Sequence, residues 1–220
     1  MNITVVMQQL VGGMGASLLI FVLTLLFSMP LGLAVAFGRM SKFKPLQAIV
    51  KVFIAILRGT PLMLQLLVVF FGPYYVFGWT LPRSYRFIAV ILGFAINYAA
   101  YFAEIYRGGI NSIDRGQYEA AHSLGLSKGQ TMMGIILPQT MKTILPPVSN
   151  EAIVLIKDTA LVSCIGVADL MKASESAVNR DVNAMAYLVA AVIYLIFTFL
   201  LTLLSNYLER RYSVYDAKED

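Results

Sequence analysis

Long apolar segments are the feature that most constrains how this chain can fold. A helix needs roughly 20 consecutive, mostly apolar residues to cross about 30 Å of hydrocarbon. Such segments predict five membrane-spanning helices, at residues 16–37, 50–71, 87–106, 145–167 and 184–207. Composition agrees, because 59% of the residues are hydrophobic, against about 45–50% in soluble domains. We therefore expect an all-α membrane protein in which residues 1–220 form a single domain.

The positions of Lys and Arg predict the orientation of the chain, because cytoplasmic loops carry an excess of these residues. One set of alternate connections holds eleven of them: Arg39, Lys42, Lys44, Lys51, Arg107, Arg115, Lys128, Lys142, Arg210, Arg211 and Lys218. The opposite set holds four: Arg83, Arg86, Lys172 and Arg180. We expect the N-terminus outside and the C-terminus in the cytoplasm.

The net charge of +5 does not indicate a nucleic-acid-binding protein. The basic residues are spread along the chain instead of forming one basic face. The only cysteine, Cys164, can form no internal disulfide, so the fold does not depend on an oxidising compartment. The charge is explained by the bias of cytoplasmic loops, and we expect a lipid bilayer but no nucleic acid among the partners.

A polar insert separates the third and fourth apolar segments. Asp114 and Gln117 have the spacing of a capping box, which predicts that a short helix begins there and ends at Gly125. Ser127 and Gln130 repeat the pattern and predict a second helix that opens there, runs through Thr131, Met132 and Met133, and stops near Pro138. The insert should therefore form two short helices joined by a glycine bend.

The insert also resembles a known motif. The matching positions are Glu119, Ala120, Ala121, Gly125, Ile135, Leu137 and Pro138. With this spacing the insert resembles the EAA loop of permease subunits of bacterial ABC importers. The resemblance implies that the first short helix docks into a groove of a cytoplasmic ATPase dimer. The alternative is an amphipathic helix on the membrane surface, but such helices usually carry a broad Lys/Arg face and this one has few basic residues.

Three further stretches resemble the polar amino-acid uptake branch of these permeases. They are RGTPL at 58–62, NYAAYFAEIYRG at 97–108 and NEAIVLIKDTA at 150–160. The resemblance implies a bacterial plasma (inner) membrane protein that works with a second permease copy or a related permease, and with an extracytoplasmic amino-acid-binding protein. It also implies that ATP and Mg²⁺ are bound by the partner ATPase, so we expect no cofactor in this chain.

Polar residues within the apolar segments are candidates for binding an amino acid. A charged group near the bilayer centre costs at least about 2.5–3.5 kcal/mol on insertion scales, so it needs a partner or a water-filled cavity. Helical spacing places Asn97, Tyr101 and Glu104 on one face of a helix, and Glu151 and Asp158 on one face of another. The predicted substrate-binding set is Asn97, Tyr98, Tyr101, Glu104, Asn150, Glu151, Asp158, Thr159 and Ser163. Carboxylates would receive the ammonium group, and amides, hydroxyls or a helix N-terminus the carboxylate.

Structural roles are open for the same residues. Asn97 is also suited to a hydrogen bond with a neighbouring helix, and Glu104 to an ion pair with Arg107 three residues on. Lys157 and Asp158 fit either a structural ion pair or part of a gate. The stretch from Arg58 through Gly59 and Thr60 to Pro61 predicts a helix break, because proline removes a backbone hydrogen bond; with Lys157, these residues are our candidates for a gate or hinge.

Other functional classes fit less well. Residues 125–129 formally match G-x-S-x-G, but the hydrolase elbow needs a preceding strand. One histidine and one cysteine cannot supply a typical zinc site, and the chain has no Walker A motif. We therefore expect a transport subunit that is not itself an enzyme. The alternative is a facilitative channel or secondary transporter for small polar solutes, which leaves the EAA pattern unexplained.

Overall fold

The computed structural model describes residues 3–213, and in this range every regular element is a helix. The elements are α1 (Ile3–Arg39), α2 (Lys44–Gly59), α3 (Leu62–Phe77), α4 (Tyr85–Asn111), α5 (Arg115–Ser123), α6 (Lys128–Thr131), the π-helical segment η1 (Met132–Ile136), α7 (Leu137–Asp158), the 3-10 segment η2 (Thr159–Ile165), α8 (Leu170–Asp181) and α9 (Met185–Ser213). The predicted all-α class is confirmed.

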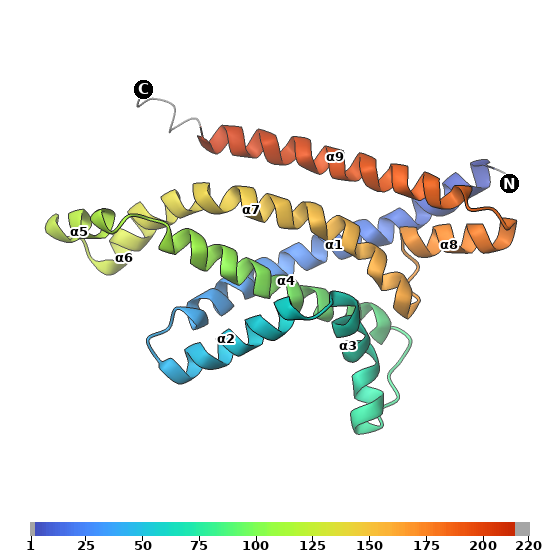
Figure 1. The fold of residues 1–220 in the computed structure, drawn as a ribbon, viewed down its shortest axis with the longest axis horizontal. Coiled ribbons are helices and arrows are strands. Elements are labelled where there is room, and N and C mark those ends of the chain that lie inside the picture. The colour runs from blue at the N-terminus through green and yellow to red at the C-terminus, as the bar shows by residue number, and fades with distance from the viewer. Residues whose placement is uncertain (1–2, 214–220) are drawn as a thin grey trace.

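Helix α4 forms the centre of the bundle (Figure 1). Phe94 and Phe102 on this helix are fully buried, and α1 packs along it. Gly32 of α1 permits the close contact, because a Cβ atom at this position would lie 2.8 Å from the Cβ atom of Phe102. The residues that α4 presents to its neighbours therefore occupy the middle of the molecule.

The two ends of the bundle carry different elements (Figure 1). The α5–α6 insert, the α1–α2 connection and the C-terminal end of α9 lie at one end. The N-terminal end of α1 and helix α8 lie at the other. The structure thus groups the connections that the Lys and Arg pattern predicts to share one side of the membrane.

Three helices are long and apolar enough to cross a membrane, namely α1, α4 and α9. The pair α2 and α3 passes the same criteria together but is bent by 108°. The described residues therefore contain three candidate spans, or four if the bent pair is one span. The predicted fourth segment, 145–167, falls on α7 and η2, and the total of five crossings stays a prediction.

The second apolar segment is not the single straight helix that its length indicates. Helix α2 ends at Gly59, Thr60 is extended, and α3 begins at Leu62 with Pro61 as its N-cap residue. Proline has no backbone N–H and disfavours helical geometry in the preceding residue. The predicted helix break at 58–61 is confirmed, whereas its use as a gating hinge stays a prediction.

The helix that was expected to stop near Pro138 instead continues without interruption. The π-helical segment η1 joins α6 to α7, and the N–H of Leu137 bonds to the carbonyl of Met132. Pro138 lies in the first turn of α7, where its missing N–H is tolerated. The expected stop is therefore wrong, because the local change of helical register absorbs the proline.

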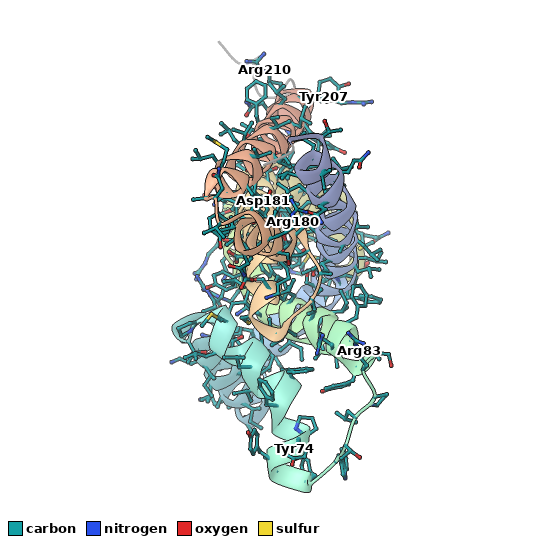
Figure 2. All side chains as sticks on the ribbon, turned by 90° about the vertical axis from the view of Figure 1, so that its right-hand side faces the viewer. Tyr74, Arg83, Arg180, Asp181, Tyr207 and Arg210 are labelled. Carbon is teal, nitrogen blue, oxygen red and sulfur yellow. The ribbon has the colours of Figure 1, made fainter. Side chains whose placement is uncertain are left out.

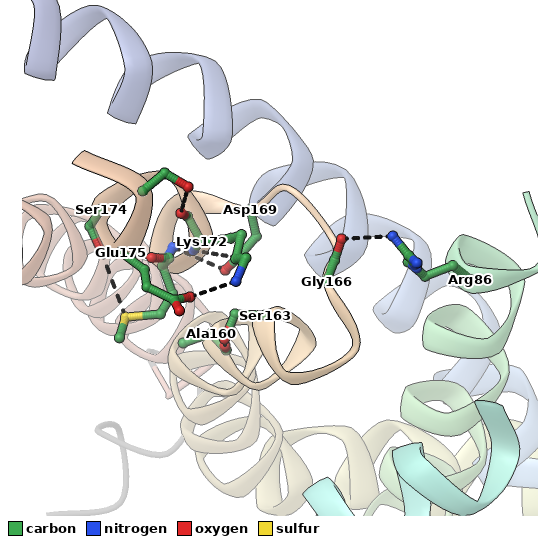
Figure 3. A network of polar contacts seen from close by, with 10 residues as sticks. Arg86, Ala160, Ser163, Gly166, Asp169, Lys172, Ser174 and Glu175 are labelled. Carbon is green, nitrogen blue, oxygen red and sulfur yellow. Dashed lines mark hydrogen bonds and ion pairs between the residues drawn. The ribbon is translucent and has the colours of Figure 1, made fainter. Parts of the chain in front are cut away.

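Helix α8 is an element that the apolar pattern did not predict. It begins after Asp169, whose carboxylate accepts hydrogen bonds from the backbone N–H groups of Met171 at 3.1 Å and Lys172 at 2.9 Å (Figure 3). Gly13 of α1 packs against this cap, because a Cβ there would lie 2.5 Å from the carbonyl oxygen of Asp169. An aspartate N-cap is a readable signal, but α8 is short and mostly polar, so a search for spans passes over it.

Candidate functional site

A partly buried hydrogen bond joins the central helix to α7. The hydroxyl of Tyr98 on α4 donates to Oδ2 of Asp158, the last residue of α7, over 2.7 Å. Tyr98 is only 2% exposed. A phenol and a carboxylate from two helices are thereby fixed against each other in the middle of the bundle.

The end of α2 brings a cation to the same face of α4. The guanidinium carbon of Arg58 lies 5.1 Å from the centre of the Tyr101 ring. That ring is 6.2 Å from the ring of Tyr98. A cation over an aromatic face is attracted by the ring quadrupole, so Arg58 is held on Tyr101, whose ring neighbours that of Tyr98.

Glu151 adds a second carboxylate, two turns before Asp158 on α7. It interacts electrostatically with Arg58 and with Asp158. We call Arg58, Tyr98, Tyr101, Glu151 and Asp158 the polar cluster. It combines one guanidinium, two phenols and two carboxylates, which together offer partners for both an ammonium and a carboxylate group.

Asn97 is buried next to the polar cluster but is engaged elsewhere. Its side-chain N–H₂ donates to the carbonyl of Leu57 at 3.1 Å and to Oε1 of Gln65 at 2.9 Å. The structure therefore shows the hydrogen bond to a neighbouring helix that was the alternative role of Asn97. Gln65 was missed in the sequence, although a glutamine inside an apolar segment shortly after a helix-breaking proline is an unusual polar residue.

Glu104 belongs to an ion cluster at the edge of the polar cluster. Its carboxylate lies 2.6 Å from Nη2 of Arg107 and 3.7 Å from Nε of Arg39, which is the last residue of α1. It also interacts electrostatically with Arg58. The alternative pairing with Arg107 is confirmed, and Arg39 extends it into a link between α1 and α4.

Three other predicted substrate residues, Thr159, Ser163 and Asn150, are not part of the polar cluster. The hydroxyl of Thr159 donates to the carbonyl of Ile156, and that of Ser163 to the carbonyl of Ala160, each at 2.8 Å. Asn150 is exposed, as is Lys157, the candidate gate residue next to Asp158. Both hydroxyls are thus occupied within the last turns of α7 and η2, and Asp158 has Tyr98 as its hydrogen-bond partner.

The polar insert has two helix caps, of which one matches the prediction fully. Ser127 and Gln130 form the complete capping box that begins α6, with bonds of 3.3 and 2.9 Å. At the start of α5, the carboxylate of Asp114 accepts from the N–H of Gly116 at 2.6 Å. Gln117 does not complete that box, because its Oε1 accepts a hydrogen bond from Gln139 of α7.

The turn between α5 and α6 contains the predicted glycine bend. Helix α5 ends at Ser123, and Gly125 adopts the left-handed conformation with φ of +71°. Glu119 and Ala120 are exposed, whereas Ala121 is 1% exposed and packs within the chain. The face available to a partner therefore includes Glu119 and Ala120 but not Ala121.

The opposite end of the bundle has a polar surface on α8. Arg180 and Asp181 lie side by side there (Figure 2). Arg180 donates to Gln9 of α1 at 2.8 Å and forms two hydrogen bonds with the carboxylate of Asp181. These bonds to the guanidinium lower the pKa of the Asp181 carboxyl. Arg86 of α4 reaches the carbonyl of Gly166 at 3.0 Å (Figure 3), so the connection before α8 is tied to the central helix.

Comparison with known proteins identifies the family. Residues 28–214 match the model described as "Binding-protein-dependent transport system inner membrane component". The chain belongs to this family. This chain is therefore a permease, a transport component of the inner membrane.

Relatives of this permease are named as amino-acid transport proteins. It is 39% identical to the L-cystine transport system permease protein TcyB of Bacillus subtilis (strain 168), over 94% of this chain and 88% of that protein. It is 36% identical to the arginine transport system permease protein ArtQ of the same organism, over 90% of each chain.

Solved structures support the fold of the permease. A crystal structure of an amino acid ABC transporter with histidines contains a chain that matches with a TM-score of 0.88 and 36% identity, covering 96% of this chain and 97% of that one. An inward-facing MetNI methionine ABC transporter chain matches with a TM-score of 0.75 at 18% identity, over 94% and 97% of the two chains. The second match concerns the fold alone.

Proposed function

We propose that this permease carries a polar amino acid across the bacterial plasma membrane, driven by ATP hydrolysis in a separate ATPase. The observation that carries the proposal is the polar cluster, in a chain whose family members serve binding-protein-dependent transport. The relatives named for cystine and arginine transport support an amino acid as the substrate. A facilitative channel or secondary transporter is less consistent with membership of this family.

The polar cluster fits the two charged groups of an amino acid. Arg58 offers a guanidinium that suits the substrate carboxylate, and Glu151 and Asp158 offer carboxylates that suit its ammonium. Tyr101 adds an aromatic face next to Arg58. We place the substrate here, and we assign Glu104 and Asn97 to supporting roles because their side chains already have protein partners.

Helix α5, the first helix of the α5–α6 insert, is the proposed contact with the ATPase dimer. Its exposed residues Glu119 and Ala120 lie on a short helix that Asp114 and the glycine bend delimit. Closure of the ATPase dimer would push on this protrusion and shift the permease between outward- and inward-facing states. ATP and Mg²⁺ are then bound by the ATPase, and this chain needs no cofactor.

The orientation follows from the Lys and Arg distribution. The end of the bundle with the α5–α6 insert would be cytoplasmic, and the N-terminus and α8 would face outward. The outer end is where an extracytoplasmic binding protein would deliver substrate. A second copy of this chain or a related permease would complete the pathway, with five crossings in each.

A pair of glycines allows a direct test of the ATPase contact. Gly125 has a positive φ, so alanine there is strained by about 1–2 kcal/mol. Gly129 has ordinary helical geometry and open space around it, so alanine there changes little. We expect Gly125→Ala and Glu119→Ala to lower both ATPase co-purification and amino-acid uptake, while Gly129→Ala leaves both unchanged. Wild-type uptake in Gly125→Ala and Glu119→Ala alike would refute the assigned contact.

A further inference from the structure

The break between α2 and α3 leaves backbone carbonyls to be satisfied. A helix end has carbonyls without intrahelical partners, and Pro61 has no N–H to offer. The side-chain amide of Gln65, in the first turns of α3, replaces the missing backbone N–H donors. Its Nε2 donates to the carbonyl of Leu57 at 2.8 Å and contacts the carbonyl and hydroxyl oxygens of Thr60 at 3.1 and 2.8 Å.

The central helix joins this arrangement through Asn97. Asn97 is 4% exposed, and its N–H₂ group donates to Oε1 of Gln65 and to the same Leu57 carbonyl that Gln65 contacts. Two amides from α3 and α4 therefore converge on one carbonyl of α2. We call Gln65 and Asn97 the amide latch.

The amide latch adjoins the cation of the polar cluster. Arg58 directly follows Leu57, and its guanidinium lies over Tyr101, which is one helical turn after Asn97 on α4. Fixing the Leu57 carbonyl against Asn97 thus also fixes where Arg58 leaves the backbone. Satisfying the free carbonyls alone would need only Gln65, whereas the bond to Asn97 sets the position of the break relative to α4.

We propose that Gln65 is a positioning residue: through Asn97 it holds the 108° bend between α2 and α3 and keeps Arg58 over Tyr101. Replacing the amide by an apolar side chain of similar length removes these bonds with little change in volume. Helix α3 then loses its fixed direction relative to α2, and Arg58 loses its fixed place in the polar cluster.

The bend can be measured directly in the full chain within its lipid-reconstituted transporter. Val52 on α2 and Val76 on α3 are 57% and 69% exposed. Val52→Cys and Val76→Cys accept spin labels once Cys164, the only native cysteine, is changed to serine. Diluting labelled chains with unlabelled ones restricts double electron–electron resonance to distances within one chain. We expect one narrow distribution of the distance between the two labels in the chain with the native Gln65. In Gln65→Met the distribution should be broad or shifted.

A matched control separates the effect of losing the amide latch from the effect of replacing any glutamine by methionine. Gln47 lies on the same helix as Leu57 but well ahead of the break, so Gln47→Met should keep the narrow distribution. Asn97→Leu should broaden it as Gln65→Met does, and the double variant should be no broader than the worse single variant, because the two residues share bonds. A wild-type distribution in Gln65→Met, or effects that simply add, would overturn the proposal.

The effect on transport is a separate readout that rests on the proposed substrate site. Uptake per correctly assembled complex should fall about tenfold in Gln65→Met, as expected when hydrogen bonds that place Arg58 are lost. A broadened distance distribution with normal uptake would mean that the amide latch holds the bend but has no role at the polar cluster. It would also contradict the placement of Arg58 in the substrate site.

Discussion

Glu104 and Asp158 are both acidic residues of predicted membrane-spanning segments, and their surroundings differ. Glu104 has two guanidinium partners, Arg107 and Arg39, which already neutralise its charge within the protein. Asp158 accepts one hydrogen bond from the neutral phenol of Tyr98, lies near a second carboxylate, Glu151, and interacts electrostatically with the adjacent, exposed Lys157. A carboxylate that guanidinium groups do not hold in close ion pairs is the better candidate for a cationic group of the substrate.

The largest effect on uptake is expected at Asp158. Asp158→Asn keeps the shape and an acceptor for Tyr98 but removes the charge. We expect uptake to fall roughly tenfold to a hundredfold, since hydrogen bonds to charged groups are worth about 1.5–3 kcal/mol. Initial rates of labelled amino-acid uptake into proteoliposomes measure this.

Tyr98→Phe is the matched control for that variant. It removes the hydrogen bond but keeps the Asp158 carboxyl group in place, so the loss of uptake should be smaller. If Asp158→Asn transported at the wild-type rate, or if Tyr98→Phe were the more damaging change, the assignment of Asp158 to the substrate would fail.

A smaller effect, of a different kind, is expected at Glu104. Glu104→Gln weakens the link between α1 and α4, which should lower the free energy of unfolding by about 1 kcal/mol, as for a partly exposed ion pair. Thermal unfolding of the purified complex measures the loss, and uptake per folded complex should change less than about twofold. Arg107→Gln should give a similar loss of stability. Normal stability combined with lost uptake would instead place Glu104 among the substrate residues.

The smallest effect is expected at Ser163. Its hydroxyl donates to the carbonyl of Ala160 in its own turn, so Ser163→Ala removes only a local bond. Stability should change by less than about 0.5 kcal/mol, as for substitutions away from special features, and uptake should be unaffected. A change in substrate affinity or selectivity in this variant would return Ser163 to the binding site.

Much of the fold was predictable because the bilayer imposes long apolar helices. The all-α class, the helix break at 58–61, the Ser127 capping box and the glycine bend all follow from local residue patterns, and each is present. The continuation past Pro138 was not predictable, because a π-helical turn depends on hydrogen-bond register that residue types do not fix. Helix α8 was missed because it is too short and polar to register as a span.

The candidate site was predictable by helix face but not by partner. Helical spacing places Glu151 and Asp158 on one face of α7, and the two interact electrostatically. Spacing does not show that Arg58, a predicted gate or hinge residue, lies over Tyr101, a predicted substrate residue. Spacing could not show that Asn97 is used by Gln65 and Leu57, because those contacts cross from one helix to another. Only the packing of three helices decides which polar side chains are already paired.

Equilibrium binding of a labelled polar amino acid to the assembled permease and ATPase, with Glu151→Gln and Glu104→Gln compared side by side, tests the central claim most directly. We predict that Glu151→Gln weakens binding about tenfold, as expected when a charged hydrogen bond is lost, whereas Glu104→Gln binds within about twofold of wild type. Equal losses in the two variants, or a larger loss in Glu104→Gln, would contradict the assignment of the polar cluster as the substrate site.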